Sequence, residues 1–313
     1  MASKINLCII SGEDRAIVPA IEEILRDTGQ NINIQFVSFE ECIKTDKHQL
    51  CVILTGSGEV EKTLEYVNQP VSFARKIIPV LYTEGTLDNM IALLSHCDID
   101  QVIRREYNWE NNLRVVLNVL FTGEIFGMEK YIGKDDQVSY LRFNDYKGRQ
   151  DVLEKVRNIA QDMGLRRIRR EHAVEAAEEL VMNALYNAPR EEDGEMIFGN
   201  IDPHKRVQMD SPKPVSLRYS VTQEGLYMAV RDRFGALDKN TVLSYIKKCL
   251  YSKEQIDRKT IGAGLGIFLT VRRVQSYIVN VAPDVATEII ISLRQAKEIG
   301  VPAVMAFFRY SRE

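Results

Sequence analysis

The sequence predicts an α/β protein with two domains, and three observations support this fold class. The first half alternates short apolar runs with amphipathic runs, which is typical of a doubly wound parallel sheet whose strands are joined by helices. The second half places helix-like runs before and between strand-like runs that indicate a mixed sheet. A chain of 313 residues is also long enough for two separate hydrophobic cores.

We expect the first domain to span residues 1–128. Apolar runs predict strands at 5–10, 32–37, 50–54, 77–81 and 101–103, and apolar-periodic runs predict helices at 14–27, 60–67, 87–95 and 109–121. A polar, glycine-containing stretch follows these elements. We therefore place a linker at residues 129–136 and a second domain at residues 137–313.

The number and order of the first-domain elements resemble the receiver domain of response regulators, but the receiver chemistry is missing. The first predicted strand is followed by Glu13 and Asp14, whereas the third ends at Thr55 with no aspartate after it. Thr83 matches the family's hydroxyl position, and an arginine at 104 or 105 replaces its lysine. The resemblance implies a degenerate receiver used for docking or for dimerisation, such as a homodimer. A generic doubly wound domain is an equal alternative.

In the second domain, a helix predicted from about Glu171 carries a row of polar residues. Glu179, Asn183 and Asn187 are spaced four residues apart, so they share one helix face. This row borders an apolar stripe that includes Leu180, and polar groups beside a core need partners. A metal ion, a water or a phosphate would supply such partners. An ordinary solvated helix face is the alternative interpretation.

A second stretch places a carboxylate at the end of a strand. A hairpin predicted at 215–221 and 226–230 leads into Asp232, and the chain then turns at Gly235. A carboxylate in this position can accept a hydrogen bond from an exocyclic amine such as that of adenine. The same Asp-x-x-Gly spacing is also common in simple turns.

A third stretch is rich in glycine. Gly262, Gly264 and Gly266 alternate before a helical pattern predicted at 269–277. Glycine lets backbone N–H groups approach an anion closely, and a helix N-terminus favours negative charge. A flexible hinge is the alternative interpretation of this run. Strands at 288–293 and 303–308 are expected to close the sheet.

In this order, the three stretches resemble the sequence boxes of the Bergerat-fold ATPases. This superfamily includes gyrase, the heat-shock chaperones, mismatch-repair ATPases, histidine kinases and anti-sigma-factor serine kinases. The helix with Glu179 is similar to the asparagine box, Asp232 to the aspartate of the first glycine box, and Gly262-Ala-Gly-Leu-Gly to the second glycine box. Thr287 matches the threonine before the family's last strand. The resemblance covers roughly residues 138–308 and is strongest to the anti-sigma kinases, which also have a helix like the one predicted at 149–164.

The resemblance implies an α/β sandwich of the Bergerat type that binds ATP and Mg²⁺. Asn183 would ligate the metal, Glu179 would orient or deprotonate the attacking hydroxyl, and Asp232 would accept a hydrogen bond from the adenine amine. The other residues expected to contact the nucleotide are Asn187, Gly235, Gly262, Gly264, Leu265, Gly266, Thr287 and Lys259, the last of these just after a lid-like segment at 240–257.

Two departures from the family pattern are the altered first glycine box and a segment at 189–214 that is longer and more polar than a compact kinase needs. Phe234 and Ala236 stand where the first glycine box usually has glycines. Between residues 126 and 149 there is no phosphoacceptor histidine and no room for a dimerising hairpin, so an acceptor would lie on another molecule. The leading hypothesis is an anti-sigma-like protein kinase. The alternatives are a nucleotide-sensing pseudo-kinase and a bare ATPase.

The charge, the apolar runs and the cysteine spacing limit the classes of partner that we expect the protein to bind. The net charge of -3 argues against a broad nucleic-acid-binding surface, and neither a membrane-spanning run nor a signal peptide is evident. The 5 cysteines are scattered without metal-ligand spacing, which is typical of reduced thiols in the cytoplasm. We therefore expect a cytoplasmic protein that acts on a protein partner, of the anti-anti-sigma, sigma or another signalling class.

Overall fold

The structure is a computed structural model that describes residues 4–9, 18–27, 33–37, 50–55, 60–67, 76–81, 85–106, 108–191, 193–206, 208–251, 264–294 and 300–310. The chain divides into two compact units. Unit 1 comprises residues 1–124 and 303–306, and unit 2 comprises residues 125–302 and 307–313. The α/β class predicted from the sequence is confirmed. Within the described ranges, no helix has the length and apolar character needed to cross a membrane.

Unit 1 is built on a parallel sheet. Its strands are β1 (Lys4–Ile9), β2 (Asn33–Val37), β3 (Leu50–Thr55), β4 (Lys76–Leu81) and β5 (Gln101–Arg104), in the order β2-β1-β3-β4-β5. All four pairings between them are parallel. Residues 304–306 of β11 (Val304–Arg309) belong to this unit and run antiparallel to β5.

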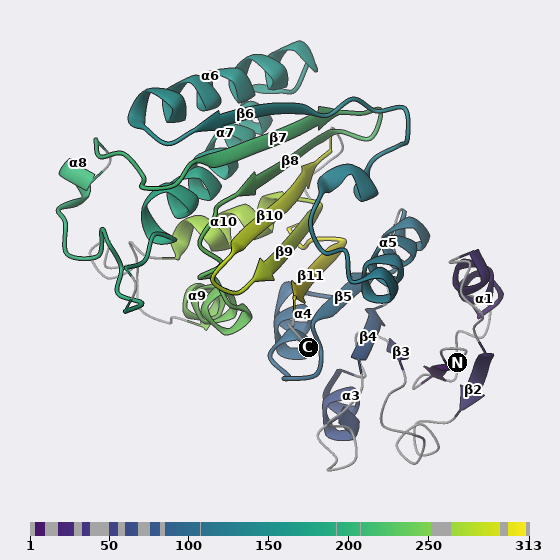
Figure 1. Ribbon diagram of the computed structural model, residues 1–313. Coiled ribbons are helices and arrows are strands. Elements are labelled where there is room, and N and C mark those ends of the chain that lie inside the picture. Colours follow the sequence, from purple (N-terminus) through teal and green to yellow (C-terminus); the bar gives the residue numbers. More distant parts are fainter. Residues whose placement is uncertain are drawn as a thin grey trace. The chain divides into compact units, whose positions relative to one another are not determined.

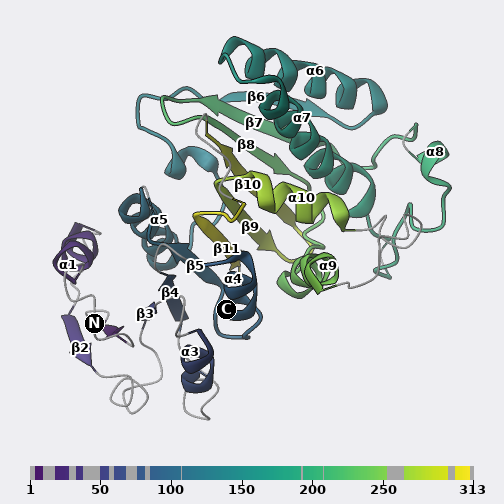
Figure 2. The same cartoon turned by 180° about the vertical axis from the view of Figure 1, so that it is seen from behind.

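Helices cover both sides of this sheet. They are α1 (Val18–Asp27), α3 (Val60–Val67), α4 (Leu87–Leu94) and α5 (Trp109–Thr122). Helix α1 packs against α5 and α3 packs against α4, and the two pairs flank opposite faces of the sheet (Figures 1 and 2). Burial on both faces explains why the strands read as continuous apolar runs in the sequence.

Unit 2 contains an antiparallel sheet. Its strands are β6 (Ser139–Phe143), β7 (Val215–Val221), β8 (Leu226–Arg231), β9 (Ser276–Ala282) and β10 (Ala286–Leu293), in the order β9-β10-β8-β7-β6. Its helices are η3 (Met128–Tyr131), α6 (Tyr146–Asp162), α7 (Arg167–Met182), η4 (Asn183–Asn187), α8 (Pro203–Arg206), α9 (Lys239–Tyr251) and α10 (Leu265–Arg273). Helices α6, α7 and α10 lie on one face of the sheet (Figure 2), and η3 lies on the other (Figure 1).

The two faces of this sheet differ in chemistry, because successive residues of a strand point to opposite sides. On the helix side, the register aligns a row of apolar residues: Leu141, Leu217, Val230, Ile289 and Val279. On the η3 side, the next row is polar: Arg142, Ser216, Arg231, Glu288 and Asn280. The core of unit 2 therefore lies under the helices, and polar groups line the opposite face.

The sequence analysis was wrong about one helix, and it missed the strands β6 and β9 and the short helices η3 and α8. The helix predicted at 269–277 ends at Arg273, because Val274 is extended and residues 276–282 pair with β10 as the buried strand β9. The apolar residues of this run fit the periodicity of a helix as well as that of a strand, and pairing with a neighbouring strand decides between the two. The residues predicted as a linker, 129–136, belong to unit 2.

Candidate functional site

Glu179, Asn183 and Asn187, which we call the acid–amide row, lie where the α-helix α7 passes into a π-helical turn. Helix α7 is held by buried small and apolar residues, among them Ala173, Ala177 and Leu180. From Asn183 the chain continues as a π-helical turn, and the N–H of Ala188 donates to the carbonyl oxygen of Asn183 at 2.8 Å. Single π-helical turns of this kind occur frequently at functional sites.

Side chains of the row are joined by hydrogen bonds. Asn187 Nδ2 donates to Asn183 Oδ1 at 2.7 Å, and Asn183 Nδ2 donates to Glu179 Oε1 at 2.8 Å. The amide oxygen of Asn183 keeps a second lone pair, which is the group that a hard cation such as Mg²⁺ prefers. The three residues predicted to act together are therefore adjacent in the structure.

The Glu179 carboxyl is mostly buried. Burial raises its pKa, the charge of the neighbouring Glu178 raises it further, and the hydrogen bond from Asn183 offsets part of the increase. Tyr277 on β9 is fully buried, and its pKa is raised by burial and by the charge of Glu179. Within the described chain, the Tyr277 hydroxyl has no hydrogen-bond partner. A carboxyl with a raised pKa suits proton transfer near neutral pH.

The end of the glycine-rich run, at Gly266, contacts the Glu179 carboxyl. Gly264 precedes α10 with φ 101, and a Cβ built on it would lie 2.5 Å from the Tyr245 ring. A Cβ on Gly266 would lie 1.8 Å from Glu179 Oε2, so any other residue there would force the Glu179 carboxylate to move. Leu265, between them, is the first residue of α10. The N-terminus of α10 therefore lies directly against the acid–amide row. Gly262 and Lys259 lie outside the described residues.

Asp232 forms the second polar centre of the helix side. The backbone N–H groups of Phe234, Gly235 and Thr287 donate to its Oδ1 at 2.8, 3.2 and 3.2 Å. Burial raises the pKa of Asp232, and these hydrogen bonds oppose the increase. Gly235 has φ 67, and a Cβ on it would lie 2.1 Å from the Ala282 carbonyl oxygen. The turn after Asp232 therefore requires glycine.

Two side chains next to Asp232 complete this centre. The Thr287 hydroxyl is buried near the Asp232 carboxylate and lowers its pKa, but its position falls short of hydrogen-bond geometry, and no other described residue bonds to it. Phe234 is buried, and Lys213 Nζ lies 4.7 Å from the centroid of its ring. The Thr287 hydroxyl therefore keeps its capacity to form a hydrogen bond, and the Phe234 ring fills space beside Asp232.

Arg190, which the sequence analysis missed, is bonded to the end of the acid–amide row and lies within electrostatic range of Asp232. It follows η4, and its guanidinium donates to the carbonyl oxygens of Asn187 and of Pro189. Burial lowers its pKa, and the charges of Asp232 and Tyr245 act in the opposite direction. Among the residues described, neutral carbonyl oxygens are the hydrogen-bond acceptors of this partly buried cation, which makes it a favourable partner for a bound anion. A basic residue just past the asparagine row was the only signal in the sequence.

These contacts bring most of the predicted residues into one site. Asn187 is bonded to Arg190, whose pKa is influenced by the charge of Asp232, and Glu179 touches Gly266 on the other side. The site combines two carboxyls, two amides, an arginine and a helix N-terminus, which is a set suited to a phosphate-bearing ligand with a hard cation. No protein-family model matches this sequence, and no curated protein searched is detectably similar to it.

Replacing Gly266 by alanine tests the contact between α10 and Glu179. Alanine favours a helix, so any loss of stability must come from the collision with the carboxylate. We expect the free energy of unfolding to fall by about 1–3 kcal/mol, as for other overpacked sites. Urea denaturation measures this change. In a Glu179→Ala background the same substitution should cost less than about 0.5 kcal/mol. Equal costs in both backgrounds would show that the two residues do not touch.

Replacing Glu179 by glutamine tests the burial of its charge. Because the folded-state pKa lies above that of the unfolded chain, the ionised carboxyl costs stability above the folded pKa and costs nothing below the unfolded value of about 4.5. Each unit of the increase corresponds to about 1.4 kcal/mol. We expect Glu179→Gln to raise the melting temperature at pH 8 and not at pH 4. The exposed glutamate Glu154, changed to glutamine, is the control. A gain that is the same at both pH values would contradict the prediction.

Proposed function

We propose that unit 2 binds ATP with Mg²⁺ in the manner of the Bergerat-fold ATPases, and that the protein acts on a signalling partner as an anti-sigma-like serine kinase. The observation that carries this proposal is the contact of Gly266 with Glu179, because it joins the helix N-terminus to the acid–amide row. Binding of a triphosphate with its metal ion requires both of these groups at one site.

The residues present fit the two ligands. Asn183 Oδ1 would hold the Mg²⁺, with Asn187 fixing the orientation of the amide. The backbone at Gly264 and Gly266 would approach the phosphates, since any side chain there would collide with its neighbours. Asp232, anchored by three N–H groups, would accept a hydrogen bond from the adenine amine, with Thr287 beside it. When bound, Mg²⁺ would supply neutralisation of the phosphate charge.

Glu179 is the residue that we assign to catalysis. The hydroxyl of a partner's serine would attack the terminal phosphorus, its proton would pass to Glu179, and the nucleoside diphosphate would leave. The raised pKa of Glu179 and its hydrogen bond to Asn183 favour this role. Arg190 would supply positive charge to the phosphates.

Unit 1 supports the signalling part of the proposal. Its strand order, β2-β1-β3-β4-β5, is the order of doubly wound domains such as the receivers. Strand β3 ends at Thr55, whose buried hydroxyl lies 2.6 Å from that of Thr63, and the sequence has no aspartate directly after this strand. Glu13, Asp14 and Thr83 lie outside the described residues. We therefore propose a receiver-like unit that docks or dimerises without accepting phosphate.

One observation favours a second candidate, a nucleotide sensor without catalysis. Phe234 is buried in the loop that in the family carries glycines, and Lys213 lies over its ring. A smaller space for the base would weaken nucleotide binding while leaving the fold intact. Incubation of labelled ATP with the protein and its co-purified partners, using wild type and Glu179→Gln, separates the candidates. Label transferred by wild type alone supports the kinase, and no transfer with intact binding supports the sensor.

Replacing Asn183 by alanine tests the proposed metal ligand. We expect the wild type to bind ATP more tightly with Mg²⁺ than with EDTA, as measured by isothermal titration calorimetry. In Asn183→Ala this dependence on Mg²⁺ should disappear, because the only amide oxygen assigned to the ion is removed. Binding that keeps its full dependence on Mg²⁺ would show that Asn183 is not the ligand.

Replacing Arg190 by glutamine tests the contact with phosphate. A charge-assisted hydrogen bond contributes about 1.5–3 kcal/mol, so we expect ATP affinity to fall about tenfold or more. Adenosine lacks phosphate, and its affinity should not change. Arg167→Gln, which removes an exposed arginine at the start of α7, is the matched control. Equal losses for ATP and adenosine would place Arg190 at the base instead.

A further inference from the structure

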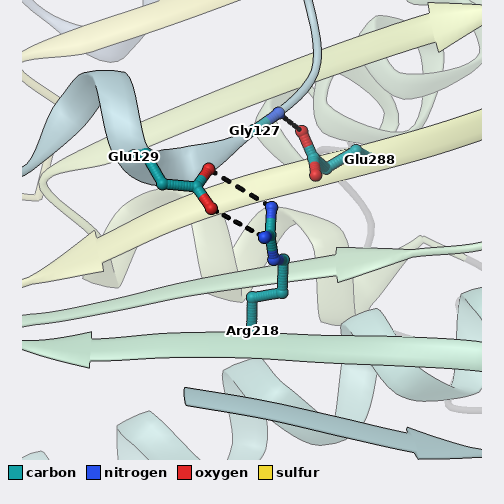
Figure 3. Close-up of polar contacts among 4 residues, drawn as sticks. All are labelled: Gly127, Glu129, Arg218 and Glu288. Carbon is teal, nitrogen blue, oxygen red and sulfur yellow. Dashed lines mark hydrogen bonds and ion pairs between the residues drawn. The ribbon is translucent and has the colours of Figure 1, made fainter. Parts of the chain in front are cut away.

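The segment that enters unit 2, residues 125–131, lies on the polar face of the sheet, and we call it the connector. Its Gly127 N–H donates to Glu288 Oε2 at 2.7 Å (Figure 3). Glu129 forms a two-point ion pair with Arg218, with contacts of 2.7 and 3.2 Å. Within the connector, Ile125, Met128 and Tyr131 are buried. The connector is therefore seated on the sheet by specific polar bonds and by apolar burial together.

Glu288 is the central residue of this contact. It is fully buried on β10, and its Oε2 accepts hydrogen bonds from Gly127 and from Asn280 Nδ2, the latter at 3.2 Å. Its other oxygen, Oε1, has no hydrogen-bond partner among the residues described. A buried carboxylate is costly unless it is hydrogen-bonded, so the N–H of Gly127 contributes strongly to the seating of β10.

Strands β8 and β10 also position the Asp232 centre, which lies on the opposite face of the sheet. On β10, Thr287 precedes Glu288, and the N–H of Thr287 donates to Asp232 Oδ1. After β8, Asp232 follows Arg231, whose guanidinium lies 4.0 Å from the centroid of the Phe126 ring of the connector. Arg231 and Glu288 are paired in the register, and the N–H of Asp232 donates to the Thr287 carbonyl oxygen at 2.9 Å. Each strand thus has one residue under the connector and its neighbour in the proposed nucleotide site.

We propose that the connector is a latch that couples the chain leaving unit 1 to nucleotide affinity. Seated on Glu288 and Arg231, it fixes the strand positions that aim Thr287 and Asp232 into the site. Displacement of the connector loosens this pair and lowers the affinity. By thermodynamic linkage, a bound nucleotide tightens the connector by the same factor. The ligand named in this coupling rests on the proposed function, whereas the mechanical link through β8 and β10 does not.

Two substitutions release the latch from different sides. Gly127→Ala acts on the connector alone, because Gly127 has φ 100 and an added Cβ would lie 2.8 Å from Glu129 Oε2. Glu288→Gln acts on the strand, because a neutral amide oxygen is a weaker acceptor than a carboxylate. Gly123→Ala is the matched control: Gly123 also has a positive φ, of 71, but nothing lies within 4 Å of its Cβ position.

Hydrogen–deuterium exchange and MgATP titration of the full chain test the proposal. We expect Gly127→Ala and Glu288→Gln to speed exchange about fivefold or more in peptides that contain Asp232 and Thr287, and to raise the Kd for MgATP by a similar factor. Gly123→Ala should change neither. Exchange and Kd that both stay within about twofold of wild type in the two latch variants would overturn the latch.

Other outcomes are equally decisive. Faster exchange with an unchanged Kd would overturn the coupling, because the loosened strands would not affect the ligand. A wild-type protein that binds no MgATP would overturn the proposed function and the assignment of the ligand. In that case, hydrogen–deuterium exchange in the peptide that contains Thr287 still shows whether the connector stabilises β8 and β10. If Gly127→Ala does not fold, Glu288→Gln supplies both measurements.

Discussion

The contact between Gly266 and the Glu179 carboxylate is the constraint on which the helix side of unit 2 depends. A single methyl group at residue 266 would collide with Glu179 Oε2, at 1.8 Å. This close approach places the N-terminus of α10 against a carboxyl that burial makes harder to ionise. The amides of Asn183 and Asn187 then have defined positions, because their hydrogen bonds begin at that carboxyl. The proposed catalytic and metal-binding roles all derive from this arrangement.

Because successive side chains of a strand point to opposite sides, the two faces of the unit 2 sheet differ in polarity. Thr287 and Glu288 are consecutive, yet the Thr287 hydroxyl lies near Asp232 on the helix side and the Glu288 carboxylate accepts from Gly127 on the connector side. A strand cannot move one of these residues without moving the other, since the backbone between them is covalent and hydrogen-bonded on both edges. The polar row on the connector side would be unfavourable for a sheet packed only through apolar contacts. In unit 2 this polar row instead binds the connector, residues 125–131.

Much of this organisation follows from sequence patterns. The alternation of apolar runs predicted the α/β class, and the spacing of Glu179, Asn183 and Asn187 predicted that they share one helix face, though not the hydrogen bonds that join them. Local patterns could not reveal β9, because its apolar residues fit a helix as well as a strand, and only pairing with β10 decides. Arg190 and Glu288 were missed for a related reason. A single charged residue has no periodicity, and its partners lie far away in the chain.

A crystal structure with Mg²⁺ and a non-hydrolysable ATP analogue tests the central claim most directly. Our account predicts the phosphates at the N-terminus of α10, the ion at about 2.0–2.1 Å from Asn183 Oδ1, and the adenine amine at Asp232. The contact between Gly266 and Glu179 should persist in that complex. An analogue bound elsewhere on the protein, or a site in which α10 has separated from Glu179, would contradict it.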